Sequence, residues 1–170
     1  MALSLPDYRI TSKADIDDVE SIVKNLGIEL KSIELTDIHN SFLNHLEKDK
    51  IVEDNLKARI RMALIYYHSN LQNKIVIGTG DKSEILLRYF TKYGDGGSDI
   101  LPIGDLYKTQ VRILGRYLKV PEQILEKESS PGLWENQTAK GEIGLSYETI
   151  DIILHLLYDR KKLLMKLEES

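Results

Sequence analysis

The stretch from residue 78 to residue 109 holds most of the side chains in this sequence that could bind a charged ligand. Thr79 lies between two glycines after the apolar run 75–77, and Glu84 follows five residues later. Backbone amides that follow a strand, and the N-terminus of the next helix, attract anions. A carboxylate at such a position is a suitable oxygen ligand for Mg²⁺. The pattern favours a nucleotide site at the carboxyl edge of a parallel sheet. The structural alternative makes Thr79 a helix cap and Glu84 a solvated residue near a positive helix end.

A second polar block, residues 91–99, contains three glycines together with Lys92, Asp95 and Asp99. Asp99 directly precedes the apolar segment 100–103, where an unpaired carboxylate would carry a desolvation cost. An aspartate can accept hydrogen bonds from ribose hydroxyls, and Lys92 can neutralise a phosphate. The block therefore favours a nucleotide contact, and a polar surface turn is the alternative.

Two cations extend this candidate site. Lys108 lies in the first turn of a predicted helix, where a cation is electrostatically unfavourable, so an anion is expected nearby. Arg59 has the planar fork that suits phosphate or carboxylate. The cluster of Lys57, Arg59 and Arg61 is otherwise interpreted as the solvated face of a helix. Neither Lys108 nor Arg59 alone decides between a ligand contact and a structural charge.

The elements that must position these residues alternate along the chain. Strands are predicted over 2–5, 30–35 and 74–78, and helices over 12–26, 38–46, 54–70 and 81–90. A cap at Asp105 is expected to start a helix that ends at Leu118, before a long loop over 127–145 and a last helix from Tyr147 to about Leu167. This alternation predicts an α/β fold, a three-layer, doubly wound parallel sheet with helices on both faces. Three strands are few for such a sheet, so the sequence resembles part of a larger α/β domain.

Composition limits the class of protein. The 170 residues are 42% apolar and 29% charged, and the net charge of −4 argues against a chain built mainly to hold nucleic acid. The absence of cysteine excludes disulfides, thiolate nucleophiles and a cysteine-dependent glutaminase. No apolar run approaches the ~20 residues of a membrane span. A cytoplasmic protein without nucleic-acid or membrane partners is expected.

Five blocks of the sequence carry a resemblance to a known family. They are residues 55–59 (Asn-Leu-Lys-Ala-Arg), 78–84 (Gly-Thr-Gly-Asp-Lys-Ser-Glu), 89–97 (Tyr-Phe-Thr-Lys-Tyr-Gly-Asp-Gly-Gly), 102–108 (Pro-Ile-Gly-Asp-Leu-Tyr-Lys) and 130–134 (Ser-Pro-Gly-Leu-Trp). In this order and spacing they closely resemble the ammonia-dependent NAD synthetases. That family has the N-type ATP pyrophosphatase, or adenine nucleotide alpha hydrolase-like, fold. The resemblance covers roughly residues 3–155.

The resemblance implies a carbon–nitrogen ligase of NAD biosynthesis. Such enzymes use ATP to adenylate the nicotinate carboxylate of deamido-NAD, and ammonia then displaces AMP. It implies ATP contacts for Thr79, Lys108 and Ser130, a Mg²⁺ ligand in Glu84, and deamido-NAD contacts for Arg59, Lys92 and Asp99. A homodimer is also implied. No catalytic nucleophile is expected, because adenylation itself makes the carboxylate electrophilic.

Two family segments have no counterpart in this sequence. One is a Ser-Gly-Gly-x-Asp-Ser phosphate loop with its strand and helix, and the other is a C-terminal His-Lys pair. We therefore expect one NAD synthetase-like domain over residues 1–170 that is incomplete at both ends, with little synthetase activity on its own. The alternatives are a synthetase whose start is clipped or misassigned, and a non-catalytic remnant or partner subunit that retains dinucleotide binding. Another ATP pyrophosphatase would share the fold but not the block 92–97.

Overall fold

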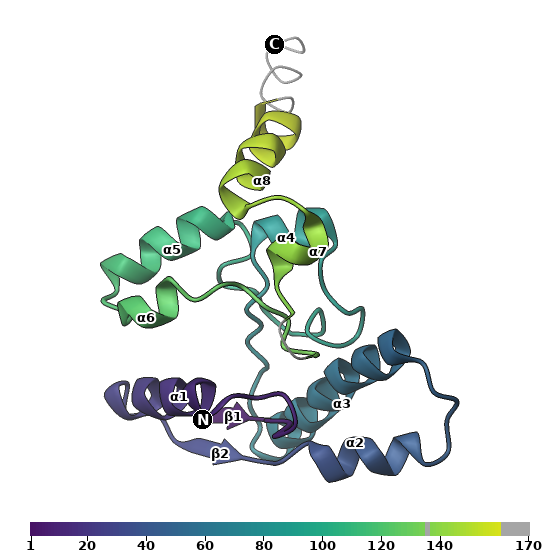
Figure 1. The fold of residues 1–170 in the computed structure, drawn as a ribbon. Coiled ribbons are helices and arrows are strands. Elements are labelled where there is room, and N and C mark those ends of the chain that lie inside the picture. The colour runs from purple at the N-terminus through teal and green to yellow at the C-terminus, as the bar shows by residue number, and fades with distance from the viewer. Residues whose placement is uncertain (135–136, 161–170) are drawn as a thin grey trace. The chain divides into compact units, whose positions relative to one another are not determined.

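The computed structural model of the chain describes residues 1–134 and 137–160. Figure 1 shows its ribbon coloured by residue number. Its internal contacts group the chain into two compact units. Unit 1 is formed by Met1–Gly78, Thr91–Ile100 and Pro131–Gln137, and unit 2 by Thr79–Phe90, Leu101–Ser130 and Thr138–Ser170. Among the described residues, no helix has the length and apolarity needed to cross a membrane. The single domain expected over 1–170 stays a prediction.

Unit 1 begins with a parallel β-α-β arrangement. Strands β1 (Ala2–Ser4) and β2 (Leu30–Ser32) pair in parallel, with Leu3 opposite Lys31, and helix α1 (Lys13–Asn25) connects them. Ser12 and Asp15 form a reciprocal capping box at the start of α1, and Gly27 follows its end with a φ of +62°. The predicted capped start, the glycine stop and the α/β class with parallel pairing are confirmed.

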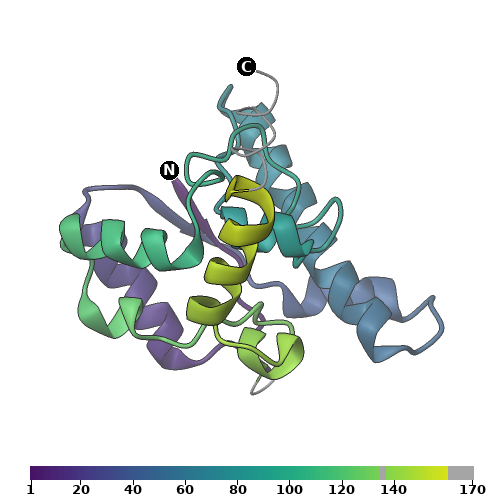
Figure 2. The ribbon, with the colours of Figure 1, turned by 90° about the horizontal axis from the view of Figure 1, so that it is seen from above.

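Two more helices complete unit 1, α2 (Thr36–Leu43) and the long α3 (Lys50–Leu71), which pack against each other and are drawn in blue in Figure 2. Asp49 caps α3 by accepting a hydrogen bond from the amide of Val52 at 3.0 Å. Ala58 and Ile60 of α3 are buried, and both lie in the helix that carries Arg59. Helix α3 therefore presents buried and exposed side chains at adjacent positions.

The predicted third strand, 74–78, is reduced to one parallel bridge between Ile77 and Ile100. The amide of Gly78 donates to the carbonyl of Ile100 at 2.9 Å. Two residues earlier, the amide of Val76 donates to the Asp99 carboxylate at 2.7 Å instead of to a backbone carbonyl. The Asp99 side chain thus replaces a backbone acceptor, which is why the parallel pairing does not extend beyond one bridge.

Unit 2 is built around α4 (Lys82–Leu87), α5 (Lys108–Tyr117), α6 (Glu122–Leu125), α7 (Ala139–Ile143), α8 (Tyr147–Leu154) and the π-helix η1 (His155–Arg160). Its buried core consists of Tyr107, Ala139, Tyr147, Ile150 and Leu154. Helix α8 contacts both α4 and α5, and Figures 1 and 2 both show α6 beside α5. The N-termini of α4 and α5 are therefore positioned by the same helix.

Three sequence expectations for unit 2 are corrected. The predicted loop 127–145 contains α7, a five-residue helix too short to leave a periodic pattern, which Thr138 caps. Asp105 does not cap α5, because Tyr107 is the N-cap. The Asp105 side chain is 100% exposed and forms a long ion pair with Lys82, at 3.6 Å. The last helix changes to a π-helix at His155, and the predicted part beyond Arg160 lies outside the described residues.

Candidate functional site

The cation that the sequence placed in an unfavourable position, Lys108, lies between two carboxylates of unit 2. Its Nζ is 2.6 Å from Asp81 Oδ2 and 2.7 Å from Glu84 Oε1. Lys108 is the first residue of α5, whereas Asp81 and Glu84 are the N-cap and third residue of α4. The anion expected near Lys108 is thus supplied by the chain itself.

A capping box fixes the two carboxylates of this cluster. Asp81 Oδ1 accepts from the amide of Glu84 at 3.0 Å, and Glu84 Oε2 accepts from the amide of Asp81 at 3.1 Å. Asp81 is therefore the cap of α4, and the alternative interpretation of Thr79 as that cap is wrong. Each carboxylate uses one oxygen for the backbone and the other for Lys108.

Burial and charge act against each other in this cluster. Burial raises the pKa of the fully buried Asp81 carboxyl, and the hydrogen bond from Lys108 only partly offsets this effect. Burial acts to lower the pKa of the Lys108 ammonium, but its hydrogen bonds to Asp81 and Glu84 outweigh burial and raise it. Lys108 is therefore a fixed, fully protonated cation at neutral pH.

Two further buried side chains, Ser83 and Asp151, close the N-terminus of α5. Ser83 Oγ accepts from the amide of Lys108 at 2.9 Å, and Asp151 Oδ2 accepts from the amide of Thr109 at 2.8 Å. Ser83 in turn donates its hydroxyl hydrogen to Asp151 Oδ1. A carboxylate at this position also compensates the positive end of the helix. These amide donors are satisfied within the protein, so they are not free to bind a ligand.

Sequence reasoning missed Asp81, Ser83 and Asp151 as parts of this site. Asp81 carried a local signal, because an aspartate followed three residues later by a glutamate is a capping-box pattern. Asp151 carried none, since it lies 42 residues along the chain from Thr109. Thr79 and Ser130, the two other residues expected to contact ATP, are both exposed.

The residues expected to contact deamido-NAD lie in unit 1. Arg59 Nε donates to the carbonyl oxygen of Lys92 at 3.2 Å, which joins α3 to the block 91–99. The Lys92 ammonium lies 4.9 Å from the centre of the Tyr93 ring. Both cations are exposed, so their remaining donors face solvent. The structure thus brings Arg59 and Lys92 together.

Asp99, the third of these residues, has a structural role in addition to any ligand contact. Its Oδ2 accepts from the amide of Val76 at 2.7 Å, and its Oδ1 accepts from the Tyr66 hydroxyl at 3.0 Å. Asp99 is exposed, so the expected desolvation cost is small. Burial of the hydroxyl and the bond to Asp99 raise the pKa of Tyr66, which stays a neutral donor.

The turn that carries Lys92 is bonded to α3 at Thr91 and is closed by a hydrogen bond of its own. The Thr91 hydroxyl donates to Asn55 Oδ1 at 2.8 Å, and the Thr91 amide donates to Asp95 Oδ1 at 2.9 Å. Gly94 lies directly against α3: a Cβ on Gly94 would be 2.8 Å from Ala58 Cβ and 3.1 Å from the Ala58 backbone carbon. The glycine therefore permits the close approach that sets the position of Lys92.

We expect Gly94→Ala to lower the free energy of unfolding by about 1–3 kcal/mol, because the added methyl group must displace helix backbone. Gly80→Ala is the matched control, since its Cβ would meet only Leu101 Cδ2, at the ordinary contact distance of 3.6 Å. Urea denaturation of both variants measures the difference. Equal stability of the two variants would show that the turn is free to move away from α3.

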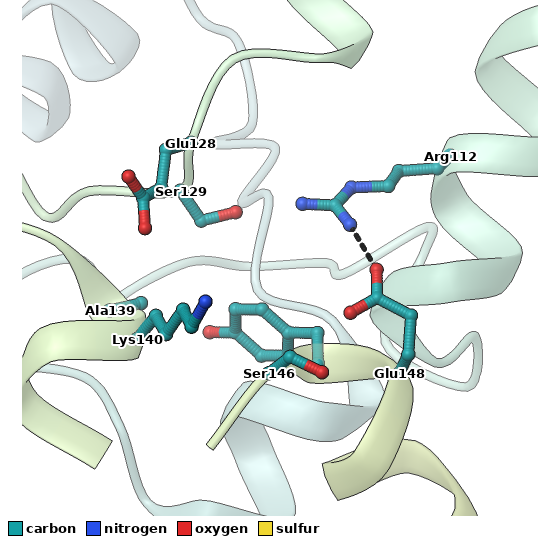
Figure 3. Close-up of a pocket in the computed structure, with 8 residues that line it drawn as sticks. Arg112, Glu128, Ser129, Ala139, Lys140, Ser146 and Glu148 are labelled. Atoms are coloured by element: carbon teal, nitrogen blue, oxygen red, sulfur yellow. Dashed lines mark hydrogen bonds and ion pairs between the residues drawn. The ribbon is translucent and has the colours of Figure 1, made fainter. Parts of the chain in front are cut away.

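Unit 2 also contains a cavity of about 150 Å³, shown in Figure 3. Arg112 of α5 points across it to Glu148 at the start of α8, with 2.8 Å between Nη1 and Oε1. Ser129 and Lys140 line the same cavity. None of the seven predicted site residues lines it, and a larger hollow of about 690 Å³ beside Lys82 and Asp159 likewise contains none of them. The predicted residues therefore lie outside both hollows.

The seven predicted residues divide by unit. Those expected to contact ATP or metal, Thr79, Glu84, Lys108 and Ser130, all belong to unit 2. Those expected to contact deamido-NAD, Arg59, Lys92 and Asp99, all belong to unit 1. The ligand contacts themselves stay predictions.

Comparison with known proteins gives consistent results. The sequence profile of the family described as NAD synthase matches residues 1–169. The NH(3)-dependent NAD(+) synthetase of Staphylothermus marinus is 52% identical over 94% of this chain and 59% of its own length. That of Sulfurisphaera tokodaii is 57% identical over 89% of this chain and 56% of its own length.

Solved structures agree with this match. An NMN synthetase from Francisella tularensis superposes with a TM-score of 0.85 at 39% identity, covering 89% of this chain and 64% of its own. An NH3-dependent NAD synthetase from Campylobacter jejuni, in complex with the nitrate ion, superposes with a TM-score of 0.73 at 33% identity, covering 96% of this chain and 64% of its own.

The chain thus spans less than two thirds of the length of the relatives named here. Within that span the profile covers nearly every residue. The chain belongs to the NAD synthase family.

Proposed function

We propose that this chain provides the nucleotide-recognition part of an ammonia-dependent NAD synthetase. The reaction is the ATP-dependent amidation of deamido-NAD, which yields NAD, AMP and pyrophosphate. The observation that carries the proposal is the identity of 52–57% to synthetases of this name across about nine tenths of the chain. The division of the predicted residues between the two units supports it.

In the proposed reaction the nicotinate carboxylate attacks the α-phosphorus of ATP, and the bond to the departing pyrophosphate breaks. Ammonia then attacks the acyl carbon, AMP leaves, and the nitrogen loses a proton. Such steps need neutralised charge and fixed orientation more than a protein nucleophile. Lys108 suits this role, because Asp81 and Glu84 hold its ammonium in one place.

A Mg²⁺ ion fits this site only in part. Among the described residues, no group of three or more histidines, cysteines or acidic residues could hold a metal ion by itself. Glu84 offers the carboxylate that remains closest to solvent, with 23% of its side chain exposed. Because Mg²⁺ usually binds one or two carboxylates together with substrate phosphates and water, Glu84 would be the one ligand from this segment, and the ion would then compete with Lys108 for its Oε1.

Arg59 and Lys92 would contact deamido-NAD. Both are exposed cations on neighbouring elements of unit 1, and Arg59 keeps its terminal guanidinium nitrogens available while Nε holds the Lys92 carbonyl. A guanidinium and an ammonium held in this way suit a dinucleotide pyrophosphate. Asp99, already fixed by Val76, would accept from a ribose hydroxyl.

Two other assignments belong to the same proposal. A homodimer is implied by the family resemblance, and a cytoplasmic location is the expectation from composition. A chain that binds the dinucleotide without catalysing the reaction, as a remnant or a partner subunit, is the alternative function. The similarity to an NMN synthetase makes nicotinate mononucleotide a second candidate substrate.

The test is isothermal titration of the purified chain with ATP–Mg²⁺, deamido-NAD and nicotinate mononucleotide. Arg59→Met and Lys92→Met should each weaken deamido-NAD binding about tenfold or more, the loss of one charge-assisted contact, and leave ATP binding unchanged. Glu84→Gln should weaken ATP–Mg²⁺ binding and leave the dinucleotide unchanged. Arg116→Met is the control, because Arg116 is an exposed cation that pairs with Glu122 and Glu126.

The outcomes separate the candidates. Binding of both nucleotides with the expected division supports the synthetase site. Dinucleotide binding without ATP binding supports the non-catalytic alternative. If the mononucleotide binds more tightly than deamido-NAD, the proposed substrate becomes the mononucleotide. If every variant loses affinity for both ATP and deamido-NAD, the assignment of ATP contacts to unit 2 and dinucleotide contacts to unit 1 is wrong.

A further inference from the structure

Lys57 is not the solvated helix residue that its sequence context suggested. It is 7% exposed, and its ammonium has three oxygen neighbours within unit 1. Nζ donates to Asp54 Oδ1 at 3.0 Å and to the carbonyl oxygen of Leu133 at 2.8 Å, and it lies 3.6 Å from Asp7 Oδ2. Two of the three ammonium hydrogens are thus donated in hydrogen bonds, and the contact with Asp7 is an ion pair.

The carboxylates around Lys57 are themselves held in place. Asp7 is fully buried, and burial acts to raise its pKa, but hydrogen bonds from Arg9 outweigh burial and lower the pKa well below its usual range. Arg9 Nη2 also lies 3.1 Å from His39 Nδ1. Since a guanidinium only donates, His39 must accept there and donate from Nε2 to the carbonyl of Glu53. The Asp7 carboxylate is therefore a fixed anion beside Lys57.

Of the three neighbours of Lys57, only Leu133 lies outside the N-terminal third of the chain. It belongs to the segment Pro131–Trp134, which follows Ser130 directly. The amide of Leu133 donates to Gln137 Oε1 at 2.9 Å, and Trp134 lies 5.4 Å from the Lys50 ammonium. Among the contacts of the described residues, the bond from Lys57 to Leu133 is the one that joins a buried charge to the backbone of this segment.

The other side of Ser130 is fixed as well. The amide of Ala139 donates to the carbonyl of Ser129 at 2.8 Å, and Thr138 begins α7 at the same point. Ser130 lies three residues before Leu133, the residue whose carbonyl oxygen the buried ammonium holds. A stretch of chain this close to a fixed atom has little conformational freedom.

We propose that Lys57 is a positioning residue: it holds the carbonyl of Leu133 and thereby fixes the backbone of Ser130, the proposed ATP contact. The ATP part of this inference rests on the proposed function, whereas the effect on the backbone does not. Loss of the ammonium should release Pro131–Trp134 while the Ser129–Ala139 bond remains.

The test compares Lys57→Met with Asp54→Asn. Methionine preserves length and apolar volume but cannot donate, so Leu133 loses its partner. Asparagine weakens the ion pair and costs stability, but it leaves the Lys57–Leu133 bond intact. Trp134, the sole tryptophan, reports the state of the segment by fluorescence, and hydrogen exchange reports the amide of Ser130. Both are measured well below the unfolding transition of each variant.

In Lys57→Met we expect a red shift of Trp134 emission, exchange of the Ser130 amide about tenfold faster, and ATP–Mg²⁺ binding about tenfold weaker. Asp54→Asn should keep the emission, the exchange rate and the ATP–Mg²⁺ affinity close to those of the starting protein.

Unchanged emission and exchange in Lys57→Met would overturn the proposal. Equal changes in both variants would also overturn it, because a general loss of stability would cause them. Changed exchange with unchanged ATP affinity would overturn the link to ATP alone. If the starting chain binds no ATP, the proposed function fails, and emission and exchange still decide the positioning role.

Discussion

Replacing Lys108 with methionine should lower the free energy of unfolding by about 3 kcal/mol at pH 7, the usual cost of removing one partner from a buried ion pair. Asp81 is fully buried and pairs with the Lys108 ammonium at 2.6 Å. Without that cation, Asp81 and Glu84 are two nearby carboxylates fixed by one capping box. The variant must therefore bury an uncompensated charge or take up a proton.

The pH dependence of this effect has a definite sign. The pKa of Asp81 is already raised in the folded protein, chiefly by burial, and loss of Lys108 raises it further. Between its unfolded and folded pKa values a raised carboxyl binds more protons in the folded state, so stability falls as pH rises. The cost of Lys108→Met should accordingly be larger at pH 8 than at pH 5. Urea denaturation at both pH values measures it, and a pH-independent loss would contradict the charge explanation.

A matched control and a double variant separate stability from binding. Lys82 is the neighbouring lysine, but its partners Asp159 and Asp105 are 33% and 100% exposed, so Lys82→Met should cost about 1 kcal/mol or less. Asp81→Asn combined with Lys108→Met removes the buried charge and keeps the capping oxygen, so it should recover part of the lost stability. ATP binding should stay lost in the double variant if Lys108 contacts the nucleotide.

Local sequence signals predicted the local parts of this fold well. Ser12, Asp15 and Gly27 define α1 because capping and a left-handed stop depend on a few adjacent residues. The unfavourable position of Lys108 correctly predicted an anion nearby. The alternation of strands and helices predicted the α/β class for the same reason, since each element is encoded by its own periodicity.

Features that depend on distant residues were not predictable in the same way. The cap expected at Asp105 is replaced by Ser83 and Asp151, which come from two other elements. The third strand is shortened because the Asp99 side chain takes the amide of Val76. Lys57 was interpreted as solvated because a cluster of cations on a helix is usually exposed, whereas its partners Asp7 and Leu133 are far away in sequence. Only tertiary structure supplies these partners.

Replacing Asp151 with alanine should be the second most damaging change, with a loss of about 2–4 kcal/mol, because buried donors are left without an acceptor and a helix loses its cap. Asp151 is 5% exposed and lies on α8. Its two oxygens accept from the Ser83 hydroxyl and from the amide of Thr109. One side chain therefore connects α8 to the starts of both α4 and α5.

The control for this change is Glu148→Ala, three residues earlier on the same helix. Glu148 pairs with Arg112, but 62% of its side chain is exposed, so the loss should stay below about 1 kcal/mol. Hydrogen exchange locates the damage: the amides of Lys108 and Thr109 should lose protection in Asp151→Ala and keep it in Glu148→Ala. The loss of stability in Asp151→Asn should fall between those of Asp151→Ala and Glu148→Ala. The asparagine side chain keeps one acceptor oxygen, but its NH₂ group faces a second donor where the carboxylate had an oxygen. Intact protection at Thr109 in Asp151→Ala would mean that solvent or another group caps α5, and that the Lys108 site does not depend on α8.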